Sequence, residues 1–461
     1  MSEIEDKPIA IDTIAAISTP PGRGGIGIVR LSGPQAAEIG AQLVRLRQPL
    51  EHGRARLADV LDADDTSAER IDEAVVTYFA APNSYTGEEL VEIAAHGSPV
   101  VLDLLLRRAM GLGARLAEPG EFTQRAFLAE KIDLTQAEAV RDLIDAQTLT
   151  QARAAASQMG GALSRRVGPV KQDLVELIAL LEAGIDFAED DIDVTGADEI
   201  ARRIGELTLP LQALEASFAR GRIMHDGLTL AIVGRPNAGK SSLFNQLVER
   251  DRAIVTETPG TTRDTVSERI ALDGIPLELV DTAGLREARE EAERMGIARS
   301  REALADAALV LIVLDATQPL NAEERELLQA VEGRAALIAM NKNDLASKPV
   351  TGIAEIGNLP MIATSALTGE GIAELRERIV ALATGGAANE PGMLTNLRQH
   401  RAVTTGISAL RDAAGANESS IPHEMILLDL YRALWALDSL TGQTTSDDIL
   451  NLIFSTFCIG K

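Results

Sequence analysis

The segment that begins at Gly234 carries the residue types that bind a phosphate chain. It reads Gly-Arg-Pro-Asn-Ala-Gly-Lys-Ser-Ser and matches the pattern G-x-x-x-x-G-K-[ST]. Gly234 and Gly239 free the backbone to turn its N–H groups toward one anion, and Lys240 can reach the β- and γ-phosphates of a nucleotide. We predict a nucleoside triphosphate site; the alternative is an unrelated glycine-rich turn. The other nucleotide-binding residues predicted here are Asn237, Ala238, Ser241 and Ser242, with Ser241 as a Mg²⁺ ligand.

The residues on either side predict the elements that position this segment. Residues 228–233 (LTLAIV) are almost continuously apolar and predict a buried β-strand, and the residues from Ser241 onward (SSLFNQLVER) predict a helix. The start of a helix adds unpaired N–H groups and the positive end of a dipole, so it favours a bound phosphate. Strand, glycine-rich turn and helix form the context in which this pattern predicts a phosphate site.

Two motifs that follow could bind Mg²⁺ and contact the γ-phosphate. Residues 260–264 read Gly-Thr-Thr-Arg-Asp, so Thr261 and Thr262 are candidates for the nucleotide site, with Thr262 as a Mg²⁺ ligand. A strand-like run (IPLELV) then leads into Asp281, and Gly284 follows three residues later. We predict that Asp281 lies near the metal through a water molecule and that the N–H of Gly284 contacts the γ-phosphate.

Two later motifs predict that the base is guanine. The run AALIAM leads into residues 341–344 (Asn-Lys-Asn-Asp), where the Asp344 carboxylate can accept hydrogen bonds from guanine N1–H and N2–H₂. Adenine lacks this pair of donors and would leave a buried carboxylate unpaired. The run IATSA supplies a backbone that can contact guanine O6. These motifs predict a GTP-binding domain, and the residues they add to its site are Asn341, Lys342, Asp344, Ser365 and Ala366.

The position after Gly284 departs from the pattern of Ras-like enzymes. Those enzymes place a water-orienting glutamine there, whereas this chain has Leu285, which can neither donate nor accept a side-chain hydrogen bond. Another group must therefore orient the attacking water. From the residues alone each candidate is most simply a solvated helix carboxylate, and the candidates stay open: Glu287, Glu290, Glu291 and Glu293.

The charge balance limits what the chain can bind by itself. Aspartate and glutamate outnumber lysine and arginine 69 to 44, for a net charge of −25. A protein that grips a phosphate backbone alone usually has a basic face, so we predict weak unaided binding to nucleic acid. One cysteine in 461 residues excludes an internal disulfide and a zinc site built on cysteines. Since no leader-like or membrane-spanning run is visible, we expect a soluble cytoplasmic protein.

Patterns along the chain predict a multidomain protein that combines α+β and α/β domains. Residues 1–130 mix short strand-like runs with glycine turns and helices, which is typical of an α+β domain. Residues 131–226 and 385–461 have helical periodicity, and residues 227–384 alternate strands and helices as a parallel sheet does. The economical arrangement is a Ras-like P-loop G domain inserted into a helical domain that is discontinuous in sequence.

Three further segments carry a resemblance to a known family. They are residues 19–25 (TPPGRGG) followed by IGIVRLSG, residues 119–127 (PGEFTQRAF) followed by LAEKIDLTQAEAV, and residues 454–461 (FSTFCIGK). Together with GRPNAGKS and GTTRD, they resemble the MnmE (TrmE) family of bacterial tRNA-modification GTPases over essentially the full length of the chain. Cys-x-Gly-Lys at the C-terminus is highly specific to that family.

The resemblance implies partners and cofactors. Members of the family form homodimers, and they form heterotetramers with the flavoprotein MnmG, which carries FAD. The two proteins add an aminomethyl or carboxymethylaminomethyl group at C5 of the wobble uridine, position 34, of certain tRNAs. The one-carbon unit comes from 5-formyl- or methylene-tetrahydrofolate, so the resemblance implies a folate-binding N-terminal domain that also dimerises. The acidic charge of this chain suits a tRNA that is held mostly through the partner.

The resemblance also implies how GTP is hydrolysed. The G domains of two subunits meet around the nucleotide, and K⁺ takes the place of an arginine finger. The implied K⁺ ligands are Asn237, Thr256, Thr258 and Thr261, of which Thr256 also counts as a GTP-binding residue. Glu293 is the residue implied to orient the attacking water, beside Lys240 and Thr262 as the other catalytic groups.

For folate, the resemblance implies four residues at matching positions: Arg30, Glu92, Lys131 and Lys461. A pterin offers an amide and amino edge that suits a carboxylate, and its glutamate tail suits a cation. From the sequence alone Arg30 and Lys131 would be plain surface cations. Cys458 stays open between an inert thiol and a contributor to the chemistry.

A regulatory GTPase similar to Era or EngA, which acts in ribosome assembly, is the alternative. Such proteins typically carry a basic RNA-binding domain, which this acidic chain lacks. We therefore favour an enzyme of tRNA modification.

Overall fold

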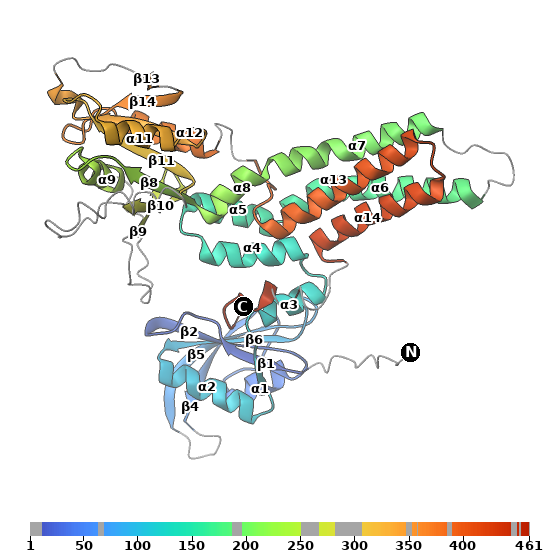
Figure 1. The fold of residues 1–461 in the computed structure, drawn as a ribbon. Coiled ribbons are helices and arrows are strands. Elements are labelled where there is room, and N and C mark those ends of the chain that lie inside the picture. The colour runs from blue at the N-terminus through green and yellow to red at the C-terminus, as the bar shows by residue number, and fades with distance from the viewer. Residues whose placement is uncertain are drawn as a thin grey trace, which may run out of the picture. The chain divides into compact units, whose positions relative to one another are not determined.

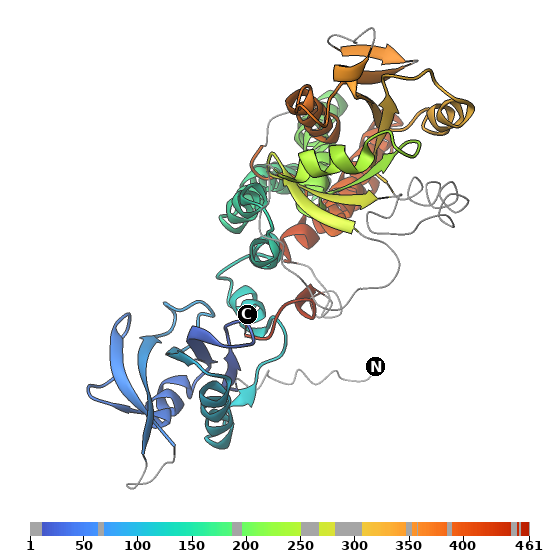
Figure 2. The ribbon, with the colours of Figure 1, turned by 90° about the vertical axis from the view of Figure 1, so that its left-hand side faces the viewer.

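The structure is a computed structural model that describes residues 12–62, 69–186, 196–249, 267–281, 307–346, 353–356, 358–384, 390–443, 450 and 453–460. The chain divides into two compact units, one of residues 1–141 and 441–461 and the other of residues 142–440 (Figures 1 and 2). No helix within the described ranges is long and apolar enough to cross a membrane.

The first unit is built on a seven-stranded sheet in the order β3-β4-β5-β6-β2-β1-β7. All neighbouring strands are antiparallel except β1 and β7, which are parallel. Apolar side chains alternate along the strands, so one face of the sheet packs on helices α1 (Ala36–Leu43) and α2 (Pro99–Gly111). The strands are β1 (Ile14–Ile17), β2 (Gly24–Ser32), β3 (Val44–Leu46), β4 (Ala55–Leu61), β5 (Arg70–Phe79), β6 (Leu90–Gly97) and β7 (Arg115–Leu116).

The C-terminal segment also belongs to the first unit. Phe454 and Phe457 are buried in a small core with Leu134, beside α3 (Glu121–Leu128) and at the start of α4 (Leu134–Asp145). Pro119 and Ile459 form an isolated antiparallel bridge. Residues from the two ends of the chain therefore complete one core.

The second unit contains a helical bundle. Apolar residues recur every three or four positions on its helices, and they meet in one large core, for example Leu163, Val167, Val170 and Leu174 on α6. Helices from two distant segments share that core, since α13 and α7 pack against each other. The helices are α5 (Leu149–Met159), α6 (Ala162–Asp186), α7 (Ala197–Ala216), α8 (Phe218–Asp226), α13 (Leu397–Glu418) and α14 (His423–Thr441).

The same unit contains a second seven-stranded sheet, in the order β13-β14-β12-β11-β8-β10-β9. Its five inner strands are parallel, and the edge strands β9 and β13 are antiparallel to their neighbours. Every residue of β11 is buried, as expected for a strand covered on both faces. The strands are β8 (Leu228–Val233), β9 (Ser267–Leu272), β10 (Ile275–Asp281), β11 (Leu309–Asp315), β12 (Ala336–Asn341), β13 (Ile353–Ile356) and β14 (Leu359–Ala363).

Helices cover both faces of this sheet. Residues of α9 (Lys240–Glu249) and α12 (Ile372–Thr384) share one core with it, and residues of α11 (Ala322–Ala330) lie against the other core. The predicted fold class, a mixture of α+β, helical and α/β parts, is confirmed. The predicted domain boundaries remain a prediction. Residues 441–461, which the sequence patterns assigned to the helical domain, lie in the first compact unit.

Candidate functional site

The phosphate loop joins β8 to α9, which are the strand and the helix predicted on either side of it. Gly234 has φ +152° and Gly239 has φ +94°, a backbone region that favours glycine. A Cβ on Gly234 would collide with the carbonyl oxygen of Val313, and one on Gly239 with the side-chain amide of Asn341. Because β8 lies between the parallel strands β10 and β11, the loop sits at the carboxyl end of a central strand, where such sheets bind ligands.

The side chains of the loop are placed to meet an anion. The Lys240 ammonium lies inside the loop and donates to the carbonyl oxygens of Gly234 (2.8 Å) and Arg235 (2.9 Å). Ser241 and Ser242 are exposed in the first turn of α9, beside N–H groups that a helix start leaves without partners within the helix. This arrangement suits a phosphate chain, which can replace carbonyl oxygens at the ammonium.

One buried side chain joins the phosphate loop to the predicted guanine motifs. Asn341, at the end of β12, donates from Nδ2 to the carbonyl oxygen of Ala238 (2.9 Å) and accepts at Oδ1 from the N–H of Ala366 (3.0 Å). Asp344 follows in a short 3₁₀ turn and is exposed. Ser365 lies just after β14, which pairs with β12. The structure thus brings together the residues predicted from three separate motifs.

Asp315, which none of the sequence motifs predicted, links two parts of the site. Its Oδ2 accepts from Lys342 Nζ (2.8 Å), and it forms a longer ion pair with Arg235 of the phosphate loop, at 3.8 Å. Burial opposes its ionisation, but hydrogen bonds from Lys342 and Thr317 outweigh burial and lower the pKa of Asp315 to about 2. The sequence does contain a signal for Asp315, because this residue ends an apolar run (LVLIVLD) as Asp281 does.

Part of the predicted nucleotide site lies outside the described residues. Asp281 is placed by its backbone at the end of β10, where it pairs in register with Ile232 of β8. Its backbone therefore lies at the same edge of the sheet as the phosphate loop. The predicted residues of which the structure says nothing are Thr256, Thr258, Thr261, Thr262, Gly284, Glu293 and Lys461.

In the first unit, two of the predicted folate residues meet. Arg30 on β2 and Glu92 on β6 are register partners, and the guanidinium donates to Glu92 Oε1 from Nη2 (2.7 Å) and from Nε (2.9 Å). The guanidinium lies 5.6 Å from the centre of the Phe122 ring and donates to the carbonyl oxygen of Gly460 (3.2 Å). Arg30 is therefore a largely buried centre that the C-terminal segment reaches, and not a plain surface cation.

The other residues predicted near this centre have separate contacts. Lys131, which follows α3, donates from Nζ to the carbonyl oxygen of Pro82 (2.8 Å) and is exposed. The Cys458 thiol is free and exposed, and its backbone carbonyl accepts from the N–H of Gly120 (3.4 Å). Tyr85 bonds Thr123 of α3 through their hydroxyls (2.9 Å), and burial raises the pKa of Tyr85.

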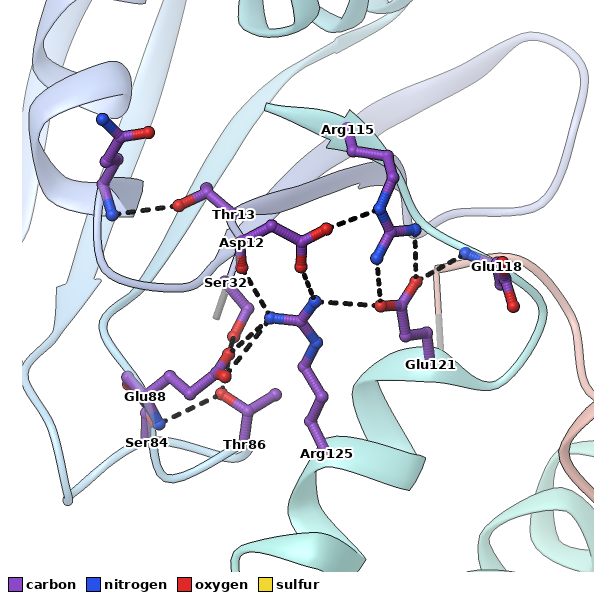
Figure 3. A network of polar contacts seen from close by, with 11 residues as sticks. Asp12, Thr13, Ser32, Ser84, Thr86, Glu88, Arg115, Glu118, Glu121 and Arg125 are labelled. Atoms are coloured by element: carbon purple, nitrogen blue, oxygen red, sulfur yellow. Dashed lines mark hydrogen bonds and ion pairs between the residues drawn. The ribbon is translucent and has the colours of Figure 1, made fainter. Parts of the chain in front are cut away.

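A network of ion pairs holds α3, which carries Phe122 and Thr123, in place (Figure 3). Arg125 donates to Asp12 (2.6 Å) and to Glu121 (2.9 Å), and its other terminal nitrogen lies 3.2 Å from both oxygens of Glu88. Arg115 of β7 bridges the same Asp12 and Glu121, at 2.7 Å each. Both guanidinium groups therefore tie α3 to Asp12, two residues before β1.

Two carboxylates of this network, Asp12 and Glu121, have a lowered pKa in the fold. Burial favours the neutral form of Glu121, but hydrogen bonds from Arg115, the N–H of Glu118 and Arg125 outweigh burial and lower the pKa of Glu121. The hydrogen bond from Arg115 is the main cause that lowers the pKa of Asp12.

A phosphate loop between β8 and α9, with guanine motifs after β12 and β14, defines a P-loop GTPase, an enzyme that hydrolyses GTP. A family model described as "MnmE helical domain" matches residues 134–458, and one described as "GTP-binding protein TrmE N-terminus" matches residues 13–131. The chain belongs to the MnmE family, which confirms the resemblance read from its motifs.

Relatives match along the whole chain. A protein of Koribacter versatilis named "tRNA modification GTPase MnmE" is 57% identical over 455 residues, which cover 98% of this chain and 99% of the relative. One of the same name from Heliobacterium modesticaldum is 42% identical over 471 residues, with the same coverage of 98% and 99%. Among solved structures, the G domain of the T. maritima FeoB iron transporter is 31% identical, covers 34% of this chain and 98% of its own, and has a TM-score of 0.26.

Proposed function

We propose that this chain is the GTPase of a tRNA-modifying enzyme pair in the cytoplasm. It hydrolyses GTP and works with the flavoprotein MnmG to add an aminomethyl or carboxymethylaminomethyl group at C5 of uridine 34 in certain tRNAs. A tetrahydrofolate derivative supplies the one-carbon unit. The observation that carries the proposal is the 57% identity over 98% of the chain to a relative named for tRNA modification.

The GTP site can be assigned to residues of this chain. Lys240 and the N–H groups of the phosphate loop bind the β- and γ-phosphates, and Asp344 accepts from the guanine edge. The hydroxyl of Ser241 is exposed in the first turn of α9, and a hydroxyl oxygen suits Mg²⁺, which prefers oxygen ligands. Ser241 and Thr262 would hold the metal directly, and Asp281 through water; the metal neutralises charge on the phosphates.

The K⁺ part of the proposal concerns Asn237, Thr256, Thr258 and Thr261. Asn237 is exposed in the phosphate loop with φ +60°, so its neutral amide oxygen is accessible to a cation. In this account Glu293 orients the water that attacks GTP. Replacing KCl by NaCl at equal ionic strength should slow GTP turnover sharply, and Glu293→Ala should abolish most turnover with GTP affinity nearly intact. Equal rates in the two salts would refute the K⁺ site.

For folate, the residues at hand suit a planar heterocycle with a charged tail. Glu92 keeps a second carboxylate oxygen beyond the one that Arg30 engages, and Phe122 and Tyr85 lie beside Arg30. A carboxylate can accept from an amide and amino edge, and the cations Lys131 and Lys461 suit a carboxylate tail. We propose that Arg30, Glu92, Lys131 and Lys461 hold the folate. Glu92→Gln should weaken binding of 5-formyl-tetrahydrofolate in calorimetry, and unchanged affinity would count against this site.

The proposal extends to the organisation of the chain. Residues 1–130 form the folate-binding and dimerising domain, and residues 131–226 with 385–461 form the helical domain. Residues 227–384 form the inserted G domain. A homodimer then pairs with the flavoprotein, which supplies most of the grip on tRNA because this chain carries a net charge of −25.

Nucleoside analysis of tRNA tests the function as a whole. In a bacterial strain that lacks its own member of the family, plasmid-borne expression of this chain should restore the modified wobble uridine, as measured by mass spectrometry. The Asp344→Asn variant should fail, because it can no longer accept both guanine donors. Unmodified uridine with the natural chain present and well expressed would contradict the proposal.

A further inference from the structure

One face of the helical bundle exposes apolar side chains at helical spacing. Met425, Leu428 and Trp435 of α14 are 54%, 54% and 55% exposed, and Ile421, just before the helix, is 38% exposed. With Arg432 they stand at intervals of four, three, four and three residues. This alternation is the spacing by which one helix packs along another. We call residues 421, 425, 428, 432 and 435 the α14 face.

The opposite side of α14 is already used by the core of the bundle. Ile426, Leu430, Ala433, Leu437 and Leu440 are buried there. The helix is therefore apolar on two sides, whereas a surface helix of a single bundle needs only one apolar stripe. Among the described residues, the side chains of the second stripe are not members of the bundle core, which indicates a surface for another molecule.

Helix α6 widens the α14 face. The hydroxyl of Tyr431 donates to Glu182 (2.6 Å), and Lys171 forms an ion pair with Asp438. These two contacts set α6 antiparallel to α14, so that Val175, which is 40% exposed, lies about level with Trp435. The apolar surface thus continues from one helix to the next.

Acidic groups border the face on three helices. Arg432 donates to Asp429 (2.6 Å) and to Asp412 of α13 (3.3 Å), so its charge is already matched. The described charged groups around the face include the carboxylates Glu182, Asp412, Glu424, Asp429 and Asp438, against the guanidinium of Arg432 and the ammonium of Lys171, so the border is acidic on balance.

The charge selects among occupants. A nucleic acid or an anionic membrane surface would be repelled by the acidic border and by the net charge of −25. A second copy of the chain would bring the same acidic border to the contact, and like charges oppose such a pairing. A helix that has an apolar stripe, with lysine or arginine beside it, would complement both the apolar side chains and the acidic border of the α14 face.

We propose that the α14 face binds an amphipathic helix with basic flanks, carried by the protein partner in tRNA modification. Its apolar residues contact Leu428 and Trp435, and its cations face Glu182, Glu424 and Asp412. The assignment rests on the proposed function, which supplies the flavoprotein as the partner, and it adds the surface on which that partner docks.

Trp435 is the only tryptophan of the chain, so it reports directly on this surface. Protein labelled with 5-fluorotryptophan gives one ¹⁹F resonance from this chain, and titration with unlabelled flavoprotein MnmG should shift it to saturation. Leu428→Glu should weaken the complex about tenfold or more, as loss of a central apolar contact does. Glu424→Lys should also weaken it, and affinity should fall as salt is raised.

A matched control separates the face from general surface effects. Leu209→Glu places the same charge on α7, at a leucine that is 70% exposed, and should leave affinity within about twofold of the natural chain. Because Leu428 and Leu209 are exposed, both variants should fold and retain GTP turnover without the partner. Turnover therefore checks their integrity.

Each other outcome overturns the proposal in a recognisable way. A complex that sediments normally while the Trp435 resonance stays unmoved would refute the surface and leave the partnership standing. No complex at all with the natural chain would refute the partnership, and the surface with it. A resonance that shifts with the concentration of this chain alone would assign the face to a second copy. If a soluble paramagnetic agent failed to broaden the resonance in the isolated chain, the face would be covered by another part of the same protein.

Discussion

Asp315 connects the two halves of the nucleotide site through one carboxylate. It accepts from Lys342 of the guanine motif and pairs with Arg235 of the phosphate loop, and its side chain is almost fully buried. Asp315→Asn keeps the shape but removes the charge. Since a hydrogen bond to a charged group contributes about 1.5–3 kcal/mol, the dissociation constant for GTP should rise roughly 10- to 100-fold.

Equilibrium titration with a fluorescent GTP analogue measures this change. Glu326→Gln is the matched control, because it also neutralises a carboxylate but at an exposed position on α11. An Asp315→Asn protein that melts like the natural chain and binds GTP within twofold of it would show that Asp315 does not position the site.

Helix α3 depends on the network around Arg125. Arg125→Met would leave Glu88 without its cation and Asp12 and Glu121 with Arg115 alone. Because Arg125 and Glu121 are largely buried, we expect a cost at the lower end of the range for a broken buried pair, about 3 kcal/mol. Hydrogen exchange of residues 115–128 should speed up accordingly. Arg107→Met, which removes an exposed pair with Asp103 on α2, should cost less than about 1 kcal/mol.

The same network predicts an effect of acid. The folded-state pKa values of Asp12 and Glu121 are lowered, so the stability they contribute is present above their ordinary pKa and is lost as pH falls through the lowered values. The difference in exchange between Arg125→Met and the natural chain should therefore shrink below about pH 4. A difference that grows in acid would mean that the carboxylates are not held as ions.

Because of His225, at the end of α8, we expect the stability of the fold to decrease at alkaline pH. Its Nε2 lies 2.9 Å from Asp142, and this hydrogen bond is the main cause that raises the pKa of His225 to about 9, against burial. A raised pKa means that the folded protein binds the proton more tightly, so the contribution is complete below about pH 6.5 and is lost as pH rises toward 9. The rise from 6.5 to about 9 corresponds to about 3 kcal/mol at 1.36 kcal/mol per pKa unit.

Calorimetric melting between pH 6 and pH 9.5 checks this expectation. The natural chain should lose stability over that range, and His225→Gln, which cannot take up the proton, should lose less. Parallel losses in the two proteins would mean that His225 and Asp142 do not form the charged pair.

Local patterns predicted those parts of the molecule that depend on neighbours in sequence. The apolar run before Gly234, the glycines of the loop and the strand-end motifs lie where the patterns placed them, because strands and tight turns are decided within a few residues. The contacts of Asp315 with Lys342 and Arg235 could not be predicted, since they depend on which strands become neighbours in the sheet.

The position of the C-terminal segment also could not be predicted, because its contacts are with residues far away in sequence. Its helical pattern indicated membership of the helical domain, yet Phe454 packs on Leu134 in the first unit, and Gly460 accepts from Arg30 and from Ser18. An apolar pattern identifies a buried face but not the core that buries it. The family resemblance placed the C-terminal residue beside folate, which is compatible with the position of Gly460 beside Arg30.

Reconstitution with purified components tests most directly whether GTP hydrolysis by this chain drives tRNA modification. The chain is combined with the flavoprotein, unmodified tRNA, a tetrahydrofolate donor, a nitrogen donor and either GTP or a nonhydrolysable analogue, and the C5-substituted uridine is measured by mass spectrometry. If GTP hydrolysis drives the modification, the modified nucleoside should form with GTP in K⁺ and almost none should form with the analogue. Equal yields with GTP and with the analogue would contradict it.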